Sequence, residues 1–214
     1  LRRDGTVWAW GRDDRRQVGD GTTTGRTTPA QVPGLTDVLA VDAGYGHTVA
    51  LRRGGTVWTW GWNSRGQVGD GTTANRSTPV QVPGLTDVVG VTAGDSTVAL
   101  RRDGTVWTWG SNYSGQLGDG TTTDRTTPLQ VPGLSDVAGV AAGGSHTAAL
   151  RADGTVWAWG GNSSGPLGDR TTPQCTTAVQ VPGLTDVAAV TAGYMHTVAL
   201  RGDGTVWTWG WNRY

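Results

Sequence analysis

One stretch of eight residues, DGTVWTWG at 103–110, recurs with small changes from positions 4, 54, 153 and 203. The second residue of every copy is a glycine, and successive copies lie 50, 49, 50 and 50 residues apart. A constant period of this length is typical of chains built from one repeated supersecondary unit, in which each unit packs on its neighbours. We therefore expect the chain to fold as an array of similar units.

The recurring stretch predicts a hairpin turn followed by a strand. An Asp-Gly pair favours a tight two-residue turn in which both residues have positive φ, and residues 106–109 are β-branched or aromatic, as suits a strand. Because side chains alternate across a strand, Trp107 and Trp109 share one face and Thr108 lies on the other. We expect the paired tryptophans to form the core and Thr108 to contribute less. Stacking of the tryptophans on a carbohydrate is the alternative.

Three more short strands are expected in each unit. Around the copy that begins at Asp153, the small apolar run 137–143 and the run 146–150 precede it, and residues 178–181 follow after a polar, glycine-rich loop. Four short strands per unit, separated by turn residues and without a helical period, predict an all-β chain whose units are four-stranded antiparallel blades of a β-propeller. A solenoid of stacked β-units is the alternative architecture.

The chain is expected to form a single domain over residues 1–214, a partial propeller of about four repeats. Repeat boundaries are expected near 38–87, 88–136 and 137–186, with partial units over 1–37 and 187–214. Leu1 aligns with Leu51, so the end units are expected to lack strands. Three arrangements are then possible: an arc cut from a larger ring, a homodimer whose split blades complete each other, or one chain closed into four blades.

The composition argues against several kinds of partner. The single cysteine, Cys175, cannot form a disulfide within the chain. The formal net charge is zero, with arginine as the basic residue and aspartate as the acidic one throughout. A neutral chain is not expected to present the broad basic face that binds nucleic acid, and we find no apolar stretch long enough to span a bilayer. We therefore expect no nucleic-acid and no membrane partner.

No constellation of residues predicts catalysis, a metal site or a cofactor. His47, His146 and His196 occupy equivalent positions in different units, so they should diverge around a ring instead of converging on a metal. Cys175 stands where the other units have arginine, and it has no histidine partner nearby in the sequence. We expect a non-enzymatic protein whose histidines form structural hydrogen bonds.

Several other motifs recur with the same period. Examples are GQLGDGT at 115–121, VPGL at 131–134, AGGSHT at 142–147 and DGTVWAWG at 153–160. Together they resemble the repeat of the regulator of chromosome condensation family, and the resemblance extends over the whole chain. It implies a β-propeller, seven-bladed in complete members, and says less about function because one fold supports many activities.

Two segments of each unit vary while their surroundings stay constant: the turn before the second strand and the start of the long loop. Binding surfaces are commonly built from variable loops on a rigid scaffold, and aromatic residues and methionine are enriched in protein interfaces. We therefore predict a surface that binds an unidentified protein partner and contains Tyr45, Trp62, Asp95, Tyr113, Tyr194 and Met195. Tyr45, Trp62, Tyr194 and Met195 are expected to be exposed, with Tyr45 and Tyr194 on one rim.

The sequence thus favours a protein-interaction scaffold, and the resemblance implies two alternatives. One is guanine-nucleotide exchange on a Ran-type small GTPase, the activity of the family's founding member. That activity depends on a wedge-like insertion, for which the regular spacing leaves no room. The other is inhibition of a bacterial enzyme, as performed by a secreted bacterial inhibitor of β-lactamase with similar repeats.

In that inhibitor, aromatic contacts come from the turn before the second strand. The corresponding positions here are Tyr45, Tyr194 and Met195, whereas Asp95 and Gly144 depart from the aromatic pattern. The sequence does not name the compartment; the resemblance favours a secreted or cell-surface protein of a bacterium.

Overall fold

The computed structural model describes residues 1–171 and 174–212, which form β-strands joined by turns and loops. In chain order the strands are β1 (Trp8–Gly11), β2 (Arg26–Gln31), β3 (Val38–Ala43), β4 (His47–Arg52), β5 (Val57–Gly61), β6 (Arg76–Gln81), β7 (Val88–Ala93), β8 (Ser96–Arg101), β9 (Val106–Gly110), β10 (Arg125–Gln130), β11 (Val137–Ala142), β12 (His146–Arg151), β13 (Val156–Gly160), β14 (Cys175–Gln180), β15 (Val187–Ala192), β16 (His196–Arg201) and β17 (Val206–Gly210). The fourth strand of the unit at Asp153 therefore begins at Cys175, earlier than the expected residue 178.

The strands form antiparallel sheets that correspond to propeller blades. β3–β6, β7–β10 and β11–β14 are three four-stranded sheets, each with its strands in chain order. The two-stranded sheet β1–β2 precedes them and the three-stranded sheet β15–β17 follows them. Within a blade, Trp109 of β9 pairs with Thr97 of β8, and Trp107 pairs with Ala99. The predicted all-β architecture of four-stranded antiparallel blades is confirmed.

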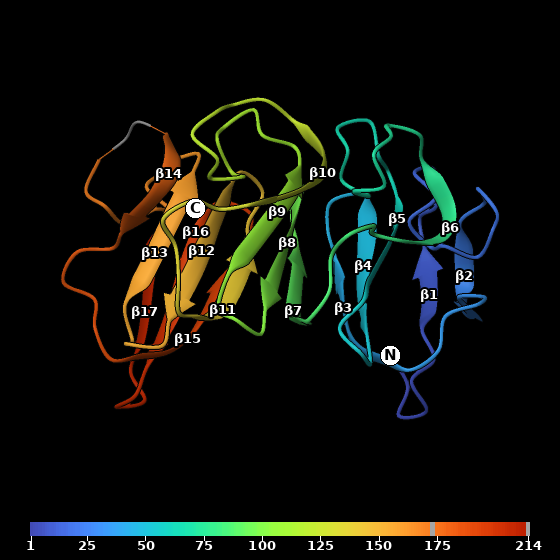
Figure 1. The fold of residues 1–214 in the computed structure, drawn as a ribbon, viewed down its shortest axis with the longest axis horizontal. Helices are drawn as coiled ribbons and strands as arrows, with labels where there is room; N and C mark the ends of the chain where they lie inside the picture. The colour runs from blue at the N-terminus through green and yellow to red at the C-terminus, as the bar shows by residue number, and fades with distance from the viewer. Residues whose placement is uncertain (172–173, 213–214) are drawn as a thin grey trace.

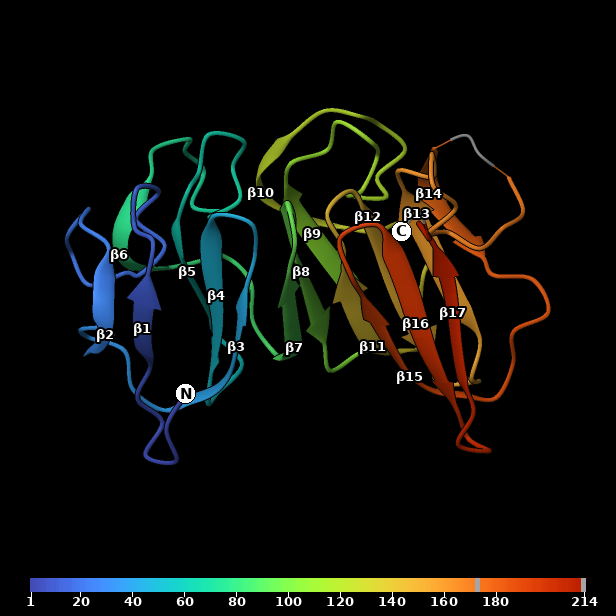
Figure 2. The same ribbon diagram turned by 180° about the vertical axis from the view of Figure 1, so that it is seen from behind.

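The blades stand side by side in an open arc (Figures 1 and 2). The first strands of consecutive blades contact one another, β3 with β7, β7 with β11 and β11 with β15, so these strands line the inner side of the arc. In both views β1–β2 and β15–β17 lie at opposite ends. Trp10 and Trp207 on these end blades are 60% and 51% exposed. The chain therefore does not close on itself into four blades.

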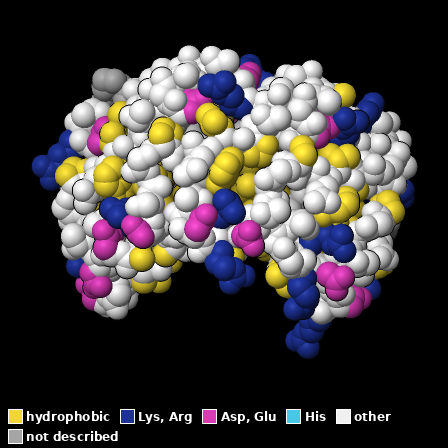
Figure 3. All heavy atoms as spheres, viewed as in Figure 1, with side chains coloured by type: hydrophobic (Ala, Val, Ile, Leu, Met, Phe, Trp, Pro, Cys, Tyr) yellow, Lys and Arg dark blue, Asp and Glu magenta, His cyan; other side chains and the backbone are white. Residues whose placement is uncertain are grey.

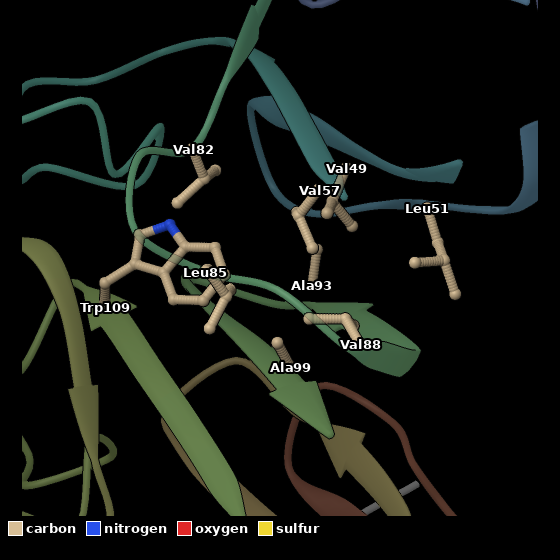
Figure 4. Packing of buried hydrophobic residues seen from close by; sticks show 9 residues of the cluster. All are labelled: Val49, Leu51, Val57, Val82, Leu85, Val88, Ala93, Ala99 and Trp109. Carbon is tan, nitrogen blue, oxygen red and sulfur yellow. The ribbon is translucent and has the colours of Figure 1, made fainter. Parts of the chain in front are cut away.

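The hydrophobic core lies between neighbouring blades. Figure 4 shows one such cluster, which joins β4 and β5 to the next blade through Val49, Leu51, Val57, Val82, Leu85, Val88, Ala93, Ala99 and Trp109. Trp109 is fully buried, as expected for a core residue. Thr108 on the opposite face is fully buried too, and its hydroxyl donates to the Leu117 carbonyl at 2.7 Å. Alternation along the strand predicted that the two faces would differ in burial. They do not, because the long loop of the same blade contacts Thr108.

The hairpin between the second and third strands differs from the predicted two-residue turn. The amide of Arg101 donates to the Thr105 carbonyl at 2.9 Å, and the amide of Gly104 donates to the Arg101 carbonyl at 3.0 Å. Of Asp103 and Gly104, only Gly104 has a positive φ, 77°, as in a three-residue loop that ends in a glycine bulge. The Asp103 carboxylate instead accepts hydrogen bonds from the amide and hydroxyl of Thr105.

Each blade is tied to the next around one backbone carbonyl. The Gln67 carbonyl accepts the Thr97 hydroxyl at 2.8 Å and the Trp109 indole N–H at 2.9 Å, both from the next blade. Thr97 Oγ1 also lies 2.8 Å from Nε2 of His47. A Cβ at position 69 would stand 2.5 Å from the indole of Trp109, so the close approach of the ring requires Gly69.

Two of the three equivalent histidines take part in these contacts. His146 lies 3.0 Å from Thr197 of the next blade, and burial lowers the pKa of His47 and of His146 to about 4, so both rings are neutral near pH 7. His196 is exposed at the end of the arc. Within the described residues, no group of three or more histidine, cysteine or aspartate side chains could hold a metal ion.

No helix among the described residues is long and apolar enough to cross a bilayer.

Candidate protein-binding rim

The turn before the second strand lies beside the start of the long loop of the same blade. The amide of Trp62 donates to the Gly46 carbonyl at 2.7 Å, and the amide of Trp211 donates to the Met195 carbonyl at 3.0 Å. Figure 1 shows the long loops along one edge of the arc and the Asp-Gly hairpins along the other. We call the first edge the rim. It comprises the turns 44–46, 94–95, 143–145 and 193–195 and the loop starts 12–16, 62–65, 111–114, 161–164 and 211–212.

The turns of neighbouring blades are joined along the rim. The amide of Tyr45 donates to the Gly94 carbonyl, and the amide of Gly144 donates to the Tyr194 carbonyl, each at 3.0 Å. Four turns together line a depression of 290 Å³, formed by residues 43–45, 93–95, 142–144 and 192–194. Most of this lining is alanine and glycine. Tyr45 and Tyr194, in the first and last of these turns, are 63% and 59% exposed.

An arginine of the preceding blade is stacked on the first aromatic pair of the rim. The rings of Tyr45 and Trp62 meet edge to face with centroids 6.4 Å apart. The guanidinium carbon of Arg15 lies 4.6 Å from the Tyr45 centroid and 4.3 Å from the Trp62 centroid. Trp62 is therefore only partly exposed, whereas the sequence predicted an exposed side chain. Cation–π contacts of this kind fix the two rings in place.

A second hollow, of 180 Å³, adjoins the depression. Tyr45, Trp62, Arg65, Gln67, Asp95, Ser111 and Tyr113 line it. The Tyr113 hydroxyl donates to Asp95 Oδ2 at 3.3 Å. Arg65 lies over the Tyr113 ring, 5.8 Å from its centroid, and its guanidinium pairs with Asp124 at 3.1 Å. Arg65 thus repeats, one blade further along, the position of Arg15 over the aromatic rings of the following blade.

Partial burial perturbs the acidic and phenolic groups of this hollow. Desolvation raises the pKa of Asp95, against the Tyr113 hydrogen bond and the Arg65 and Arg15 charges, which lower it. Burial and the adjacent Asp95 carboxylate raise the pKa of Tyr113 to about 12. Tyr113 therefore remains a neutral hydrogen-bond donor near pH 7.

The last turn places its two predicted residues differently. The Tyr194 ring lies against the backbone of Gly144, where a Cβ would stand 2.6 Å from the ring. Met195 is half-buried, not exposed as predicted, and lines a separate hollow with Trp211 and Ser163. Five of the six predicted residues thus lie around the two adjoining hollows, and Met195 lies apart from them.

Sequence reasoning missed Arg15, Arg65 and Trp211 as rim residues. The two arginines stack on aromatic rings of the following blade, and Trp211 is 44% exposed. The signal was present, because all three lie in the variable loop starts. The sequence prediction favoured aromatic residues and therefore did not include the arginines of the loop starts.

The periodic motifs match an established family. The family description "Regulator of chromosome condensation (RCC1) repeat" matches residues 4–51, 54–100, 103–150 and 153–200, and a second form of the same repeat matches 38–67, 88–116, 137–165 and 187–214. The chain belongs to the RCC1 repeat family. No curated protein sequence matches it.

Solved structures of RCC1-type propellers are similar to the arc. Prp20p from Saccharomyces cerevisiae, in a study of its binding to Gsp1p and histones, is 26% identical with a TM-score of 0.87, over 100% of this chain and 55% of Prp20p. The same yeast protein bound to Kap60 gives a TM-score of 0.86 at 26% identity, over 100% and 54% of the two chains. Human WBSCR16 gives 0.84 at 26% identity, over 98% and 57%. The chain therefore spans little more than half the length of these three structures.

Proposed function

We propose that this RCC1-repeat chain is a non-enzymatic interaction module whose rim binds a protein partner. The observation that carries the proposal is the convergence of Tyr45, Trp62, Asp95, Tyr113 and Tyr194 around two adjoining hollows. These residues come from different blades, yet they form one surface. Met195 extends the same edge towards the last blade.

The chemistry of the rim supports a protein partner. Tyrosine, tryptophan and arginine are enriched among the binding hot spots of protein interfaces. Here Arg15 and Arg65 hold aromatic rings in fixed positions, which lowers the entropy cost of binding. On the face drawn in Figure 3, arginine and aspartate side chains are interspersed. That pattern favours a protein partner over nucleic acid, which selects a continuous basic surface.

The proposal is tested by comparing variants in their capture of a partner from the source cells. Tyr45→Ala and Tyr194→Ala should each weaken binding by about 2 kcal/mol, roughly thirtyfold. Leu129→Ala, at an exposed apolar position on the outer strand β10, is the matched control and should bind as the wild type does. Equal binding by all four proteins would reject the rim as the binding surface.

Nucleotide exchange on a Ran-type GTPase is the second candidate function. The observation in its favour is the similarity to Prp20p, whose binding to Gsp1p has been studied. Accelerated release of guanine nucleotide from such a GTPase, at a low ratio of this chain to GTPase, would establish exchange in place of simple binding. Inhibition of a bacterial enzyme such as a β-lactamase is a special case of partner binding and would appear as loss of that enzyme's activity.

We also propose that two copies associate through their incomplete end blades, β1–β2 of one copy and β15–β16 of the other, which together form one four-stranded blade. Thr48 Oγ1 donates to the Gln17 carbonyl at 2.9 Å, as Thr97 does to the Gln67 carbonyl. Within the described residues, however, no histidine of a preceding blade reaches Thr48, and no threonine of a following blade meets His196. If β15 and β16 of a second copy joined β1 and β2, His196 of that copy would meet Thr48, and β1 would take the place of β17.

A further inference from the structure

Asp95 is the one charged residue among those that line the depression. Its turn, Gly94-Asp95-Ser96, is one residue shorter than Gly44-Tyr45-Gly46-His47 in the preceding blade. Ser96 is 2% exposed and begins β8, as His47 begins β4, so Asp95 stands at the tip of its turn. The shorter turn thus places a carboxylate between the exposed Tyr45 and Tyr194 turns.

The Asp95 carboxylate is only weakly compensated by its own chain. It accepts a single long hydrogen bond from Tyr113 at 3.3 Å, and within the described residues it takes part in no ion pair. The nearest cations are otherwise engaged: Arg15 is stacked on two rings, and Arg65 pairs with Asp124. Partial burial also raises the pKa of Asp95, which indicates a carboxylate that lacks a strong counter-charge.

We propose that the depression accepts an arginine side chain of the protein partner, with the Asp95 carboxylate as its counter-ion and the Tyr45 and Tyr194 rings as its walls. The proposal rests on the rim being the binding surface. A planar guanidinium can pair with a carboxylate and stack on an aromatic face at the same time. A metal ion fits less well, because calcium takes six to eight oxygen ligands and Asp95 is the single charged group here.

The depression has the shape and polarity for this occupant. Its volume of 290 Å³ is open to solvent, and alanine and glycine form most of its surface, so they leave space beside Asp95. The aliphatic part of an arginine can lie along such a surface while its guanidinium reaches the carboxylate. Pairing with a guanidinium favours the ionised form of Asp95, so affinity should fall as Asp95 becomes protonated in acid.

The test uses three acetylated and amidated tripeptides, Gly-Arg-Gly, Gly-Gln-Gly and Gly-Leu-Gly, titrated into the full chain at low ionic strength and followed by NMR. Gly-Arg-Gly should bind the wild type with a dissociation constant of about 1 mM or weaker, and tighter than the other two. Asp95→Asn keeps the shape of the side chain and should weaken binding of the arginine peptide roughly fivefold to tenfold. Asp87→Asn is the control, because Asp87 directly precedes the first residue of β7, at the end of the strand away from Asp95. It should leave binding unchanged.

Two results would overturn the proposal. One is binding of Gly-Leu-Gly as tight as that of Gly-Arg-Gly, unaffected by Asp95→Asn; the other is no binding of Gly-Arg-Gly to the wild type. Neither result bears on the rim as a whole, because that is decided by partner capture with Tyr45→Ala and Tyr194→Ala. If those variants fail to bind the partner while Asp95→Asn binds it fully, the rim remains the proposed binding surface and the arginine proposal is rejected.

Discussion

Asp13 occupies, in the first unit, the position that Asn63 and Asn112 hold in the next two. Its Oδ1 accepts the Val18 amide at 2.9 Å, as Asn63 Oδ1 accepts the Val68 amide. Asn63 also donates from Nδ2 to two loop carbonyls at 3.0 Å. In Asp13 the corresponding atom is the acceptor Oδ2, which is buried and has no partner among the described residues. At this position the repeat places loop carbonyls that accept hydrogen bonds from an asparagine amide. The Asp13 carboxylate cannot donate such bonds when it is ionised.

Asp13→Asn should therefore stabilise the chain near pH 7 by about 1 kcal/mol or more, because the amide can donate where the carboxylate cannot. Burial raises the pKa of Asp13. A raised pKa means that stability is full below the unfolded-state pKa and is lost as pH rises through the folded-state pKa. The gain from the variant should thus shrink on acidification to about pH 3.

Urea unfolding of both proteins at the two pH values measures this effect. Asp14→Asn is the control, because it removes the neighbouring exposed charge, which pairs with the exposed Arg12, and leaves Asp13 unchanged. An equal gain in stability from Asp14→Asn and Asp13→Asn would show that the gain comes from removing a negative charge. It would reject the explanation from the buried Asp13 carboxylate.

Arg170 is a second departure at the residue scale. It has a φ of 65°, where Gly21, Gly71 and Gly120 have φ values of 83–89°. A side chain in this left-handed region costs about 1 kcal/mol. Arg170→Gly should therefore raise the free energy of unfolding by up to about 1 kcal/mol, less the added freedom of the unfolded chain. Gly120→Arg, the reverse change in an intact unit, should lower it; thermal melts in which the two changes have the same sign would refute the explanation.

At the scale of the strand, the two tryptophans of β9 have unequal roles. Trp109 is fully buried and hydrogen-bonded to the preceding blade, whereas Trp107 is partly exposed and donates to Thr105 at 3.2 Å in its own hairpin. Trp109→Ala should cost about 3–5 kcal/mol of stability, and Trp107→Ala about 1–2 kcal/mol. Denaturant unfolding of the two variants measures these losses. Equal losses of stability would mean that the contact of Trp109 with the preceding blade adds nothing to stability.

The elements were largely predictable from the sequence, because the repeated turn and strand residues fix the strands of each blade. The hairpin type was not, since Asp-Gly fits both a two-residue turn and the observed loop with Gly104 alone at positive φ. The burial of Thr108 was also missed, because it depends on the long loop of the blade folding back to the Leu117 carbonyl. The stacking of Arg15 on Trp62 joins two neighbouring blades, so it could not be read from the sequence around either residue.

At the scale of the whole molecule, the open arc exposes apolar surface at both ends. If β15 and β16 of one copy join β1 and β2 of another as proposed, light scattering should give the mass of two chains at micromolar concentration, because the joint blade removes exposed sheet edges. Trp10 is 60% exposed in the single chain and would be buried in the joint blade, so Trp10→Arg should yield a monomer. Leu129→Arg on β10 is the control, and a wild type that stays monomeric at all concentrations would exclude the exchange.

We propose that the rim, and not the hairpin edge or the ends of the arc, is the binding surface. Amide hydrogen exchange, measured with and without the captured partner, reports every turn at once and therefore tests this proposal. We expect slower exchange at the turns 44–46, 94–95 and 193–195 and at the loop starts 62–65 and 111–114, with no change at the hairpins 52–56 and 101–105. Protection confined to those hairpins or to β1 and β17 would reject the rim as the binding surface.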